Sequence, residues 1–246
     1  MSLYSVVSRL FRSVLFVFFP NSCVFCGSFQ KDSVCQKCDD VLVVANSPYF
    51  CPLCKKTEVL SVGYICDICQ KKDPGFSKLY SVYSGLEKEV ITYVSSIKYS
   101  YVTGNMDRCV DDFSLFVSQL PQQERDQLFQ EFAWVSVPLY WFRYLQRGFN
   151  QSQLFVDILS DVYPSLRKEA LLLRKRHTRR QAVLDKETRK TNLDNAFVLN
   201  PSVSCVPEKV LLVDDVYTTG STIRECVSVL KKAGVKEIRV LVLFRK

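Results

Sequence analysis

One run near the C-terminal end constrains the fold more than any other: Lys209-Val-Leu-Leu-Val-Asp-Asp-Val-Tyr-Thr-Thr-Gly-Ser-Thr-Ile223. Its four consecutive apolar residues, 210–213, are too few for a helix and predict a strand buried on both faces. An acidic pair and a hydroxyl-rich stretch follow. Apolar residues then recur at helical spacing up to Leu230, and Gly234 closes that helix. The run therefore predicts a strand, an acidic pair, a small-residue loop and a helix, in that order.

The chemistry of this unit suits a sugar phosphate. Unpaired N–H groups at the start of a helix attract a phosphate, and Gly220 lets the backbone approach it closely. Asp214 and Asp215 can accept hydrogen bonds from two neighbouring ribose hydroxyls. Four hydroxyl side chains add donors around the expected phosphate, namely Thr218, Thr219, Ser221 and Thr222. The alternative is a buried strand with an acidic turn and an ordinary helix cap.

The rest of the chain alternates between strand and helix patterns. Further strands are predicted at 79–84, 132–137, 170–173 and 238–244. Helices are predicted at 87–99, 105–120 and 150–163. This alternation predicts an α/β fold with a doubly wound parallel sheet, whose ligands bind beyond the carboxyl ends of the strands. No glycine begins a GxxxxGK[ST] or GxGxxG motif, which excludes a P-loop ATPase.

Eight of the eleven cysteines form four C-x-x-C pairs: Cys23 and Cys26, Cys35 and Cys38, Cys51 and Cys54, Cys66 and Cys69. Zinc prefers four thiolates at tetrahedral corners, so two pairs complete one site. The pattern predicts two closed, structural zinc sites in a reducing compartment. Either consecutive pairs or alternate, cross-braced pairs can share an ion, and a thioredoxin-like redox role is a further alternative. Cys109, Cys205 and Cys226 are expected to be small buried side chains.

Residues 1–20 are apolar and aromatic, and are interrupted by Arg9 and Arg12. The longest apolar run there, 14–19, is far shorter than the roughly 20 residues that cross a bilayer. We expect a helix that packs on the protein's own body, or alternatively a membrane-surface anchor. The remaining chain divides into a cysteine module over 21–73 and a larger domain over 76–246.

Positive charge is concentrated in one segment. The net charge of the chain is +8, and residues 167–190 hold ten Lys or Arg against three acids. This balance favours a polyanionic partner, either pyrophosphate or nucleic acid. Residues 174–192 lack an apolar period, which predicts a loop that closes over a charged substrate. Its candidate contacts with substrate or DNA are Arg174, Arg176, Arg179, Arg180 and Gln181.

A second anion site is predicted where Val137-Pro-Leu139 ends a strand and Arg147-Gly-Phe-Asn-Gln151 opens a helix. A solvated arginine and an asparagine helix cap explain the same residues. Several aromatic side chains lie between these two stretches, beside Arg143. They can stack nucleic-acid bases or pack in the core, and they are Tyr140, Trp141, Phe142 and Tyr144.

The 209–223 run resembles the phosphoribosyl-pyrophosphate (PRPP) motif of type I phosphoribosyltransferases: four hydrophobic residues, two acids and a T-T-G-[ST]-T-like loop. The order of motifs along the chain is similar to that of the ComF (ComFC) family of competence proteins. That order runs from the C-x-x-C pairs through I-K-Y, V-P-L, R-G-F-N-Q and a basic loop with R-R-Q and R-x-x-N to V-D-D-x-x-T-T-G-[ST]-T. The resemblance covers nearly the whole chain, from about Cys23 onward.

The resemblance implies roles for particular residues. Asp214 and Asp215 would hold the ribose, and Lys98 and Arg147 would contact a pyrophosphate whose charge Mg²⁺ neutralises; these four are the candidate catalytic residues. The PRPP-binding residues would be Asp214, Asp215, Val216, Thr218, Thr219, Gly220, Ser221 and Thr222. The expected location is the cytoplasm or the periphery of the inner membrane face.

Two functions are therefore expected. One is a PRPP-binding protein of the DNA-uptake machinery that also binds single-stranded DNA and meets a DNA-uptake helicase or other competence proteins. The other is a genuine phosphoribosyltransferase with an unidentified acceptor. No nucleophile or general base can be named, because His177, the one histidine, lies among basic neighbours that resist its protonation.

Overall fold

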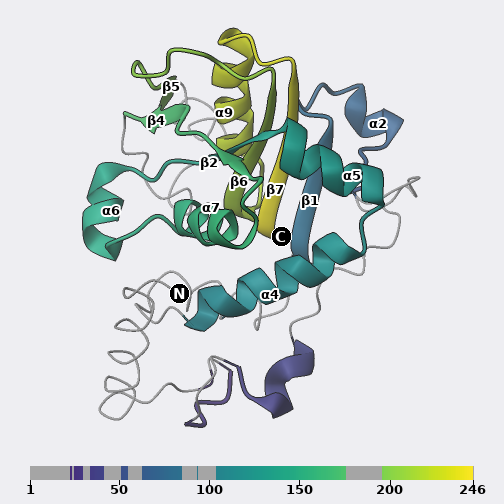
Figure 1. Cartoon of the computed structure of the whole chain (residues 1–246), viewed down its shortest axis with the longest axis vertical. Helices are drawn as coiled ribbons and strands as arrows, with labels where there is room; N and C mark the ends of the chain where they lie inside the picture. Colours follow the sequence, from purple (N-terminus) through teal and green to yellow (C-terminus); the bar gives the residue numbers. More distant parts are fainter. Residues whose placement is uncertain are drawn as a thin grey trace.

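A five-stranded parallel sheet forms the centre of the molecule, with the strand order β1-β7-β6-β2-β3 (Figure 1). The computed structural model describes residues 23, 25–29, 34–41, 51–54, 63–84, 93, 104–175 and 196–245. The strands of the sheet are β1 (Lys78–Ser84), β2 (Ala133–Ser136), β3 (Arg167–Lys168), β6 (Lys209–Tyr217) and β7 (Glu237–Arg245).

Helices cover both faces of this sheet, as the predicted doubly wound architecture requires. Alternate side chains of β6 point to opposite faces. Leu211 and Val213 belong to a buried cluster with α4 (Gly104–Ser118) and α7 (Gln151–Val162). Val210 and Leu212 belong to a second cluster with α9 (Ser221–Lys232). The central strand is therefore buried on both faces, which explains its unbroken apolar run.

Several elements match their prediction and others were missed. β1, β2, β7, α4, α7 and α9 lie where the periodicity placed them. The missed helices of the larger domain are α5 (Gln122–Asp126), the π-helical turn η2 (Gln127–Glu131) and α6 (Trp141–Arg147). The predicted helix 87–99 lies outside the described residues except for Tyr93, which is buried against Tyr83 and Phe244.

The expectation that residues 170–173 add a strand to the parallel sheet is wrong. The edge strand is β3, and the apolar residues after it form β4 (Leu172–Arg174). β4 pairs in antiparallel fashion with β5 (Phe197–Leu199) in a separate two-stranded sheet. Leu171 and Leu172 are buried in the cluster on the α9 face. The local pattern predicted a strand here, but it carries no information on which strand these residues pair with.

The described parts of the cysteine module contain two short helices, η1 (Gln36–Val41) and α2 (Asp67–Gln70). An isolated bridge between Tyr64 and Lys78 joins the module to the start of β1. The predicted N-terminal helix over 1–20 lies outside the described residues. Within the described part of the chain, no helix has the length and apolar character to span a membrane.

Candidate functional site: the carboxyl end of β6

The acidic pair lies within a strand and not after it. β6 continues to Tyr217, four residues beyond the predicted apolar run, and Asp214 faces Val242 of β7 in the register. Both carboxylates are half-buried. The Asp214 Oδ1 atom accepts hydrogen bonds from the Asp215 backbone N–H at 2.9 Å and from the Ser152 hydroxyl at 3.4 Å. Asp214 is therefore held at the edge where parallel-sheet ligands bind.

The loop after β6 leads directly into α9 through Gly220, which has a φ of 70°. A Cβ atom there would lie 2.3 Å from the Tyr217 hydroxyl oxygen, so the position requires glycine for its backbone angle and for space. The Thr219 and Ser221 hydroxyl oxygens lie 3.1 Å apart, and Arg224 donates to the Thr219 carbonyl at 2.8 Å. Among the described residues, no side chain caps the start of α9. Its first N–H groups are thus suited to an anion.

Tyr217 supports the loop from below. Its side chain is buried in the cluster on the α9 face together with Ile223 and Val227. Burial raises the pKa of the Tyr217 phenol, and it outweighs the nearby positive charges of Arg224 and Arg245, which act in the opposite direction. The phenol therefore stays neutral and packs directly against Gly220.

The second predicted anion site, at residues 137–139 and 147–151, lies next to β6 because α7 connects the two. Asn150 donates from its side-chain amide to the Val137 carbonyl at 3.0 Å, which ties the end of β2 to the start of α7. Two residues later, Ser152 contacts Asp214. Gln151 is buried, and its Nε2 atom has no hydrogen-bond partner within the described parts of the chain. The side chain of Arg147, and all of Lys98, lie outside the described residues.

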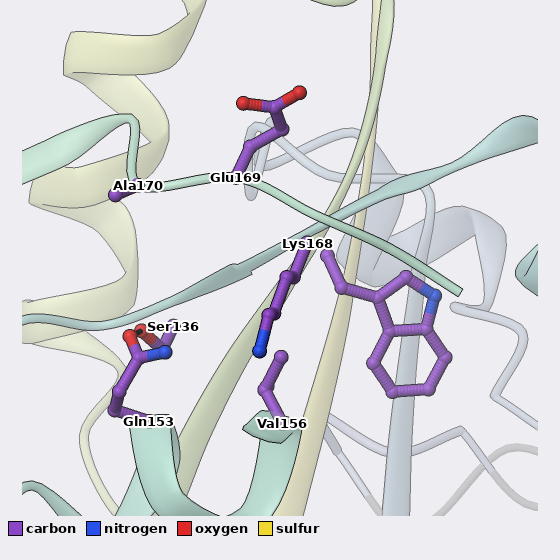
Figure 2. A pocket seen from close by; sticks show the side chains of 7 residues that line it. Ser136, Gln153, Val156, Lys168, Glu169 and Ala170 are labelled. Atoms are coloured by element: carbon purple, nitrogen blue, oxygen red, sulfur yellow. Dashed lines mark hydrogen bonds between the residues drawn. The ribbon is translucent and has the colours of Figure 1, made fainter. Parts of the chain in front are cut away.

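A small pocket lies beside this site, between α7 and the edge strand β3 (Figure 2). The Ser136 hydroxyl donates to Gln153 Oε1 at 2.5 Å across its wall. The Glu169 carboxylate points away from the other side chains in Figure 2. The volume of the pocket, about 190 Å³, is below the roughly 300–1,000 Å³ of usual ligand sites. The pocket is lined by Trp134, Ser136, Gln153, Val156, Lys168, Glu169 and Ala170. None of the predicted site residues is among them, so the end of β6 remains the candidate.

The described residues that flank the basic segment on either side, Lys175 and Ala196, lie next to each other. The Lys175 backbone N–H donates to the Ala196 carbonyl at 2.8 Å. The Glu225 carboxylate of α9 accepts the backbone N–H groups of Ala196 at 2.6 Å and Phe197 at 3.3 Å. The Arg174 guanidinium lies over the Phe197 ring, 5.1 Å from its centroid. The remaining predicted contacts of this segment lie outside the described residues: Arg176, Arg179, Arg180 and Gln181.

The eight paired cysteines form two tetrads in sequential order, and not in the cross-braced order. One tetrad is Cys23, Cys26, Cys35 and Cys38, and the other is Cys51, Cys54, Cys66 and Cys69. All sulfur atoms of a tetrad lie within 4.8 Å of one another. The Cys26–Cys35 and Cys54–Cys66 sulfur distances of 3.6 and 3.7 Å match the roughly 3.8 Å edge of a tetrahedron with Zn–S bonds of about 2.3 Å. Both tetrads therefore fit a metal ion, consistent with structural zinc.

The thiols of the two tetrads differ in acidity. In the first tetrad, the hydrogen bond with the Ser28 side chain lowers the pKa of the Cys26 thiol to about 6. Burial, followed by hydrogen bonds with Cys66 and Cys54, raises the pKa of the Cys69 thiol to about 12. Four thiolates in this space need a cation to coexist, because each disfavours ionisation of the others. Among the other cysteines, Cys109 and Cys226 are buried as predicted, whereas Cys205 is exposed, contrary to the prediction.

Sequence reasoning missed Ser152, Tyr217 and Arg224. A small hydroxyl residue in the first turn of a helix, a tyrosine at a strand end and an arginine on a helix are each common without function. Ser152 acts through a contact with Asp214 that only the fold creates, whereas Tyr217 and Arg224 support Gly220 and Thr219 within one local turn.

Comparison with known domains identifies the class of protein to which this site belongs. A model of the phosphoribosyl transferase domain matches residues 156–246, which include β6, the loop and α9. The α/β fold with its parallel sheet and this match define a phosphoribosyltransferase-like protein.

Whole-chain relatives give the family. Competence protein F of Haemophilus influenzae is 32% identical over 93% of this chain and 98% of its own length. Competence protein ComFC of Streptococcus pneumoniae is 28% identical over 91% of this chain and 99% of its own. DNA utilization protein YhgH of Escherichia coli K12 is 31% identical, covering 92% and 97%. The chain therefore belongs to the ComF family of competence and DNA utilization proteins.

Proposed function

We propose that this protein binds PRPP and single-stranded DNA as a phosphoribosyltransferase-like component of the DNA-uptake machinery. The similarity to competence and DNA utilization proteins supports the uptake role. One observation carries the PRPP assignment: the acidic pair of β6 lies at the carboxyl edge of the sheet, directly before an uncapped, hydroxyl-rich helix start. A ribose with an attached phosphate offers complementary groups to both.

Each part of PRPP then has a set of partners. The carboxylates of Asp214 and Asp215 accept hydrogen bonds from the ribose hydroxyls, while the backbone and hydroxyls of 218–222 bind the 5′-phosphate. Lys98, Arg147 and the 174–192 segment neutralise the pyrophosphate. Bound Mg²⁺ would add positive charge at the leaving group. Ser152 positions Asp214 through its hydrogen bond.

Calorimetric titration with PRPP and Mg²⁺ tests the assignment. The double substitution Asp214→Ala and Asp215→Ala should reduce PRPP affinity at least about 100-fold, because two charge-assisted contacts of about 1.5–3 kcal/mol each are lost. Glu208→Ala is the matched control: Glu208 lies just before β6, at the opposite end of the strand, in an exposed ion pair with Lys236. Unchanged affinity in the double variant would remove the ribose assignment.

The alternative is a genuine phosphoribosyltransferase with an unidentified acceptor, and the domain match over 156–246 favours it. In that reaction the bond between ribose C1 and the pyrophosphate oxygen breaks, and the acceptor's electron pair forms the new bond at C1. Pyrophosphate release from PRPP, measured with and without single-stranded DNA, separates turnover from binding alone.

The remaining proposals concern the setting. We infer that both tetrads hold structural zinc. We also infer that the protein works in the cytoplasm or at the periphery of the inner membrane face, where residues 1–20 would supply the surface contact. Its inferred partners are a DNA-uptake helicase or other competence proteins. The competence names of the relatives support the partners, and the close grouping of the sulfur atoms supports the zinc.

A further inference from the structure

The short helix α6 exposes an unusual amount of aromatic surface. Among the large hydrophobic side chains exposed in the described part of the chain, four lie on this seven-residue helix. Trp141 is 59% exposed, Phe142 44%, Tyr144 50% and Leu145 70%. The sequence left open whether these aromatics stack bases or pack in the core, and their exposure excludes the core. Exposed apolar clusters of this kind mark interaction surfaces.

The rings form one continuous ridge. At 100° per residue, Tyr144, Trp141, Leu145 and Phe142 occupy a single arc of about 160° on the helix. The Trp141 ring packs edge-on against Phe142, with centroids 5.9 Å apart, and is tilted against Tyr140 at 5.6 Å. We call Trp141, Phe142, Tyr144 and Leu145 the α6 ridge. Three of its four members present aromatic faces, and the contact between their rings holds Trp141 and Phe142 in place.

The residues of α6 favour a ligand that combines negative charges with planar rings. α6 also carries Arg143 and Arg147 and has no acidic residue. In Figure 1, α6 stands at the outer side of the molecule beyond α7, on the side where β4 and β5 also lie. β4 ends in Arg174, the first residue of the basic run. The helix is also close to the candidate site, because Ser152, five residues after α6 ends, contacts Asp214.

We propose that the α6 ridge is a stacking platform for the bases of single-stranded DNA, beside the PRPP site. Aromatic side chains stack on any base, and neighbouring basic residues follow the phosphate backbone. The inference rests on the DNA-binding part of the proposed function and names its surface. A lipid surface or an apolar protein partner would use Leu145, the most exposed member of the ridge, as fully as the rings. Base stacking would use the rings alone.

The chain offers its own spectroscopic reporter. It contains two tryptophans, and Trp134 is fully buried, with its indole N–H donating to the Leu128 carbonyl at 2.8 Å. Trp141 is therefore the tryptophan that DNA can reach. Titration of the full-length protein with oligothymidine should quench tryptophan fluorescence, and Trp141→Phe should abolish the quenching while retaining DNA binding.

Affinity measurements on the same protein decide the proposal. In fluorescence anisotropy with labelled oligothymidine at fixed salt, Trp141→Ala should weaken binding at least about fivefold, because one stacked base contributes about 1–3 kcal/mol. Leu145→Ala, the matched control on the same ridge, should leave DNA affinity unchanged. Both variants replace exposed side chains, and both should bind PRPP like the wild type.

The other outcomes distinguish a failure of the α6 ridge proposal from a failure of the proposed function. Wild-type DNA binding that Trp141→Ala leaves intact would overturn the ridge but not the uptake function. Equal losses in Trp141→Ala and Leu145→Ala would indicate apolar docking and overturn stacking. Loss of sedimentation with anionic lipid vesicles in both variants, with DNA affinity intact, would assign the ridge to a membrane surface. A wild type that binds no DNA would overturn the DNA-binding part of the proposed function itself.

Discussion

At the scale of single residues, Gly220 and Tyr217 set the shape of the loop between β6 and α9. The left-handed backbone at Gly220 turns the chain from β6 into α9, and the Tyr217 hydroxyl fills the space that a side chain would need. Because burial keeps the phenol neutral, this support does not depend on charge. The loop is thus held from beneath by packing and from the side by Arg224.

Gly220→Ala should therefore damage both stability and binding. The strained backbone and the clash with Tyr217 together should lower the free energy of unfolding by about 2–4 kcal/mol and weaken PRPP binding. Gly234→Ala is the control, because Gly234 has a φ of 100° but nothing lies near its virtual Cβ; it should cost stability alone. Urea unfolding and PRPP calorimetry measure the two effects. Wild-type PRPP affinity in Gly220→Ala would contradict this account of the loop.

A buried charge network joins three elements at the opposite end of the sheet. Glu124 of α5 accepts hydrogen bonds from Lys78 and Tyr80 of β1, and from Arg239 of β7 at 2.9 Å. Burial alone would raise the pKa of the Glu124 carboxyl, but the hydrogen bonds from Lys78 and Tyr80 and the nearby positive charges lower it overall. The network locks a helix that the sequence pattern did not predict onto the edge of the sheet.

Glu124→Gln should lower the free energy of unfolding by about 2–3 kcal/mol at pH 7, because Lys78 and Arg239 lose their shared carboxylate. The depressed pKa fixes the sign of the pH effect. The contribution is complete above the ordinary carboxyl pKa of about 4.5 and is lost as the pH falls through the lower folded value. Urea unfolding should therefore show the gap between wild type and variant closing in acid.

Glu131→Gln is the control for this experiment. Its ion pair with Lys209 is exposed, so its loss should cost less than about 1 kcal/mol. A gap between wild type and Glu124→Gln that is constant from pH 7 to pH 3 would show that the carboxylate charge does not stabilise the network.

At the scale of the whole molecule, the two cysteine tetrads connect the cysteine module to the buried clusters on both faces of the sheet. Val34, beside Cys35, belongs to the cluster on the α4 and α7 face, and Cys38 packs against that cluster. Cys51, Cys66 and Cys69 belong to the cluster on the α9 face. Metal binding at either tetrad should therefore stabilise the α/β core as well as the module itself.

Metal content per chain tests the sequential arrangement. The wild type should contain two zinc ions by elemental mass spectrometry, and the double substitution Cys26→Ser and Cys35→Ser should leave one, because both ligands belong to the same tetrad. A cross-braced protein would lose both ions. Cys54→Ser with Cys66→Ser is the matched pair and should also leave one. A wild type with no metal and intact disulfides would falsify the tetrad assignment.

Local patterns in the sequence determined the type of most elements and the chemistry of the candidate site. The apolar run 210–213, the acids behind it and Gly220 specify a buried strand, a carboxylate pair and a tight turn, because each depends on residues adjacent in the chain. The C-x-x-C spacing likewise specified metal ligands, since one turn presents two thiols. α6 was missed although its apolar residues recur at helical spacing, because a helix of seven residues is too short for periodicity to identify.

Tertiary structure alone decided which elements meet. The spacing of residues in the sequence did not settle four features: the pairing of β4 with β5, the sequential grouping of the tetrads, the contact of Ser152 with Asp214 and the exposure of Trp141. Burial of apolar surface is non-directional, so it drives Leu172 inward without choosing its partner strand. That choice follows from the packing of the whole molecule.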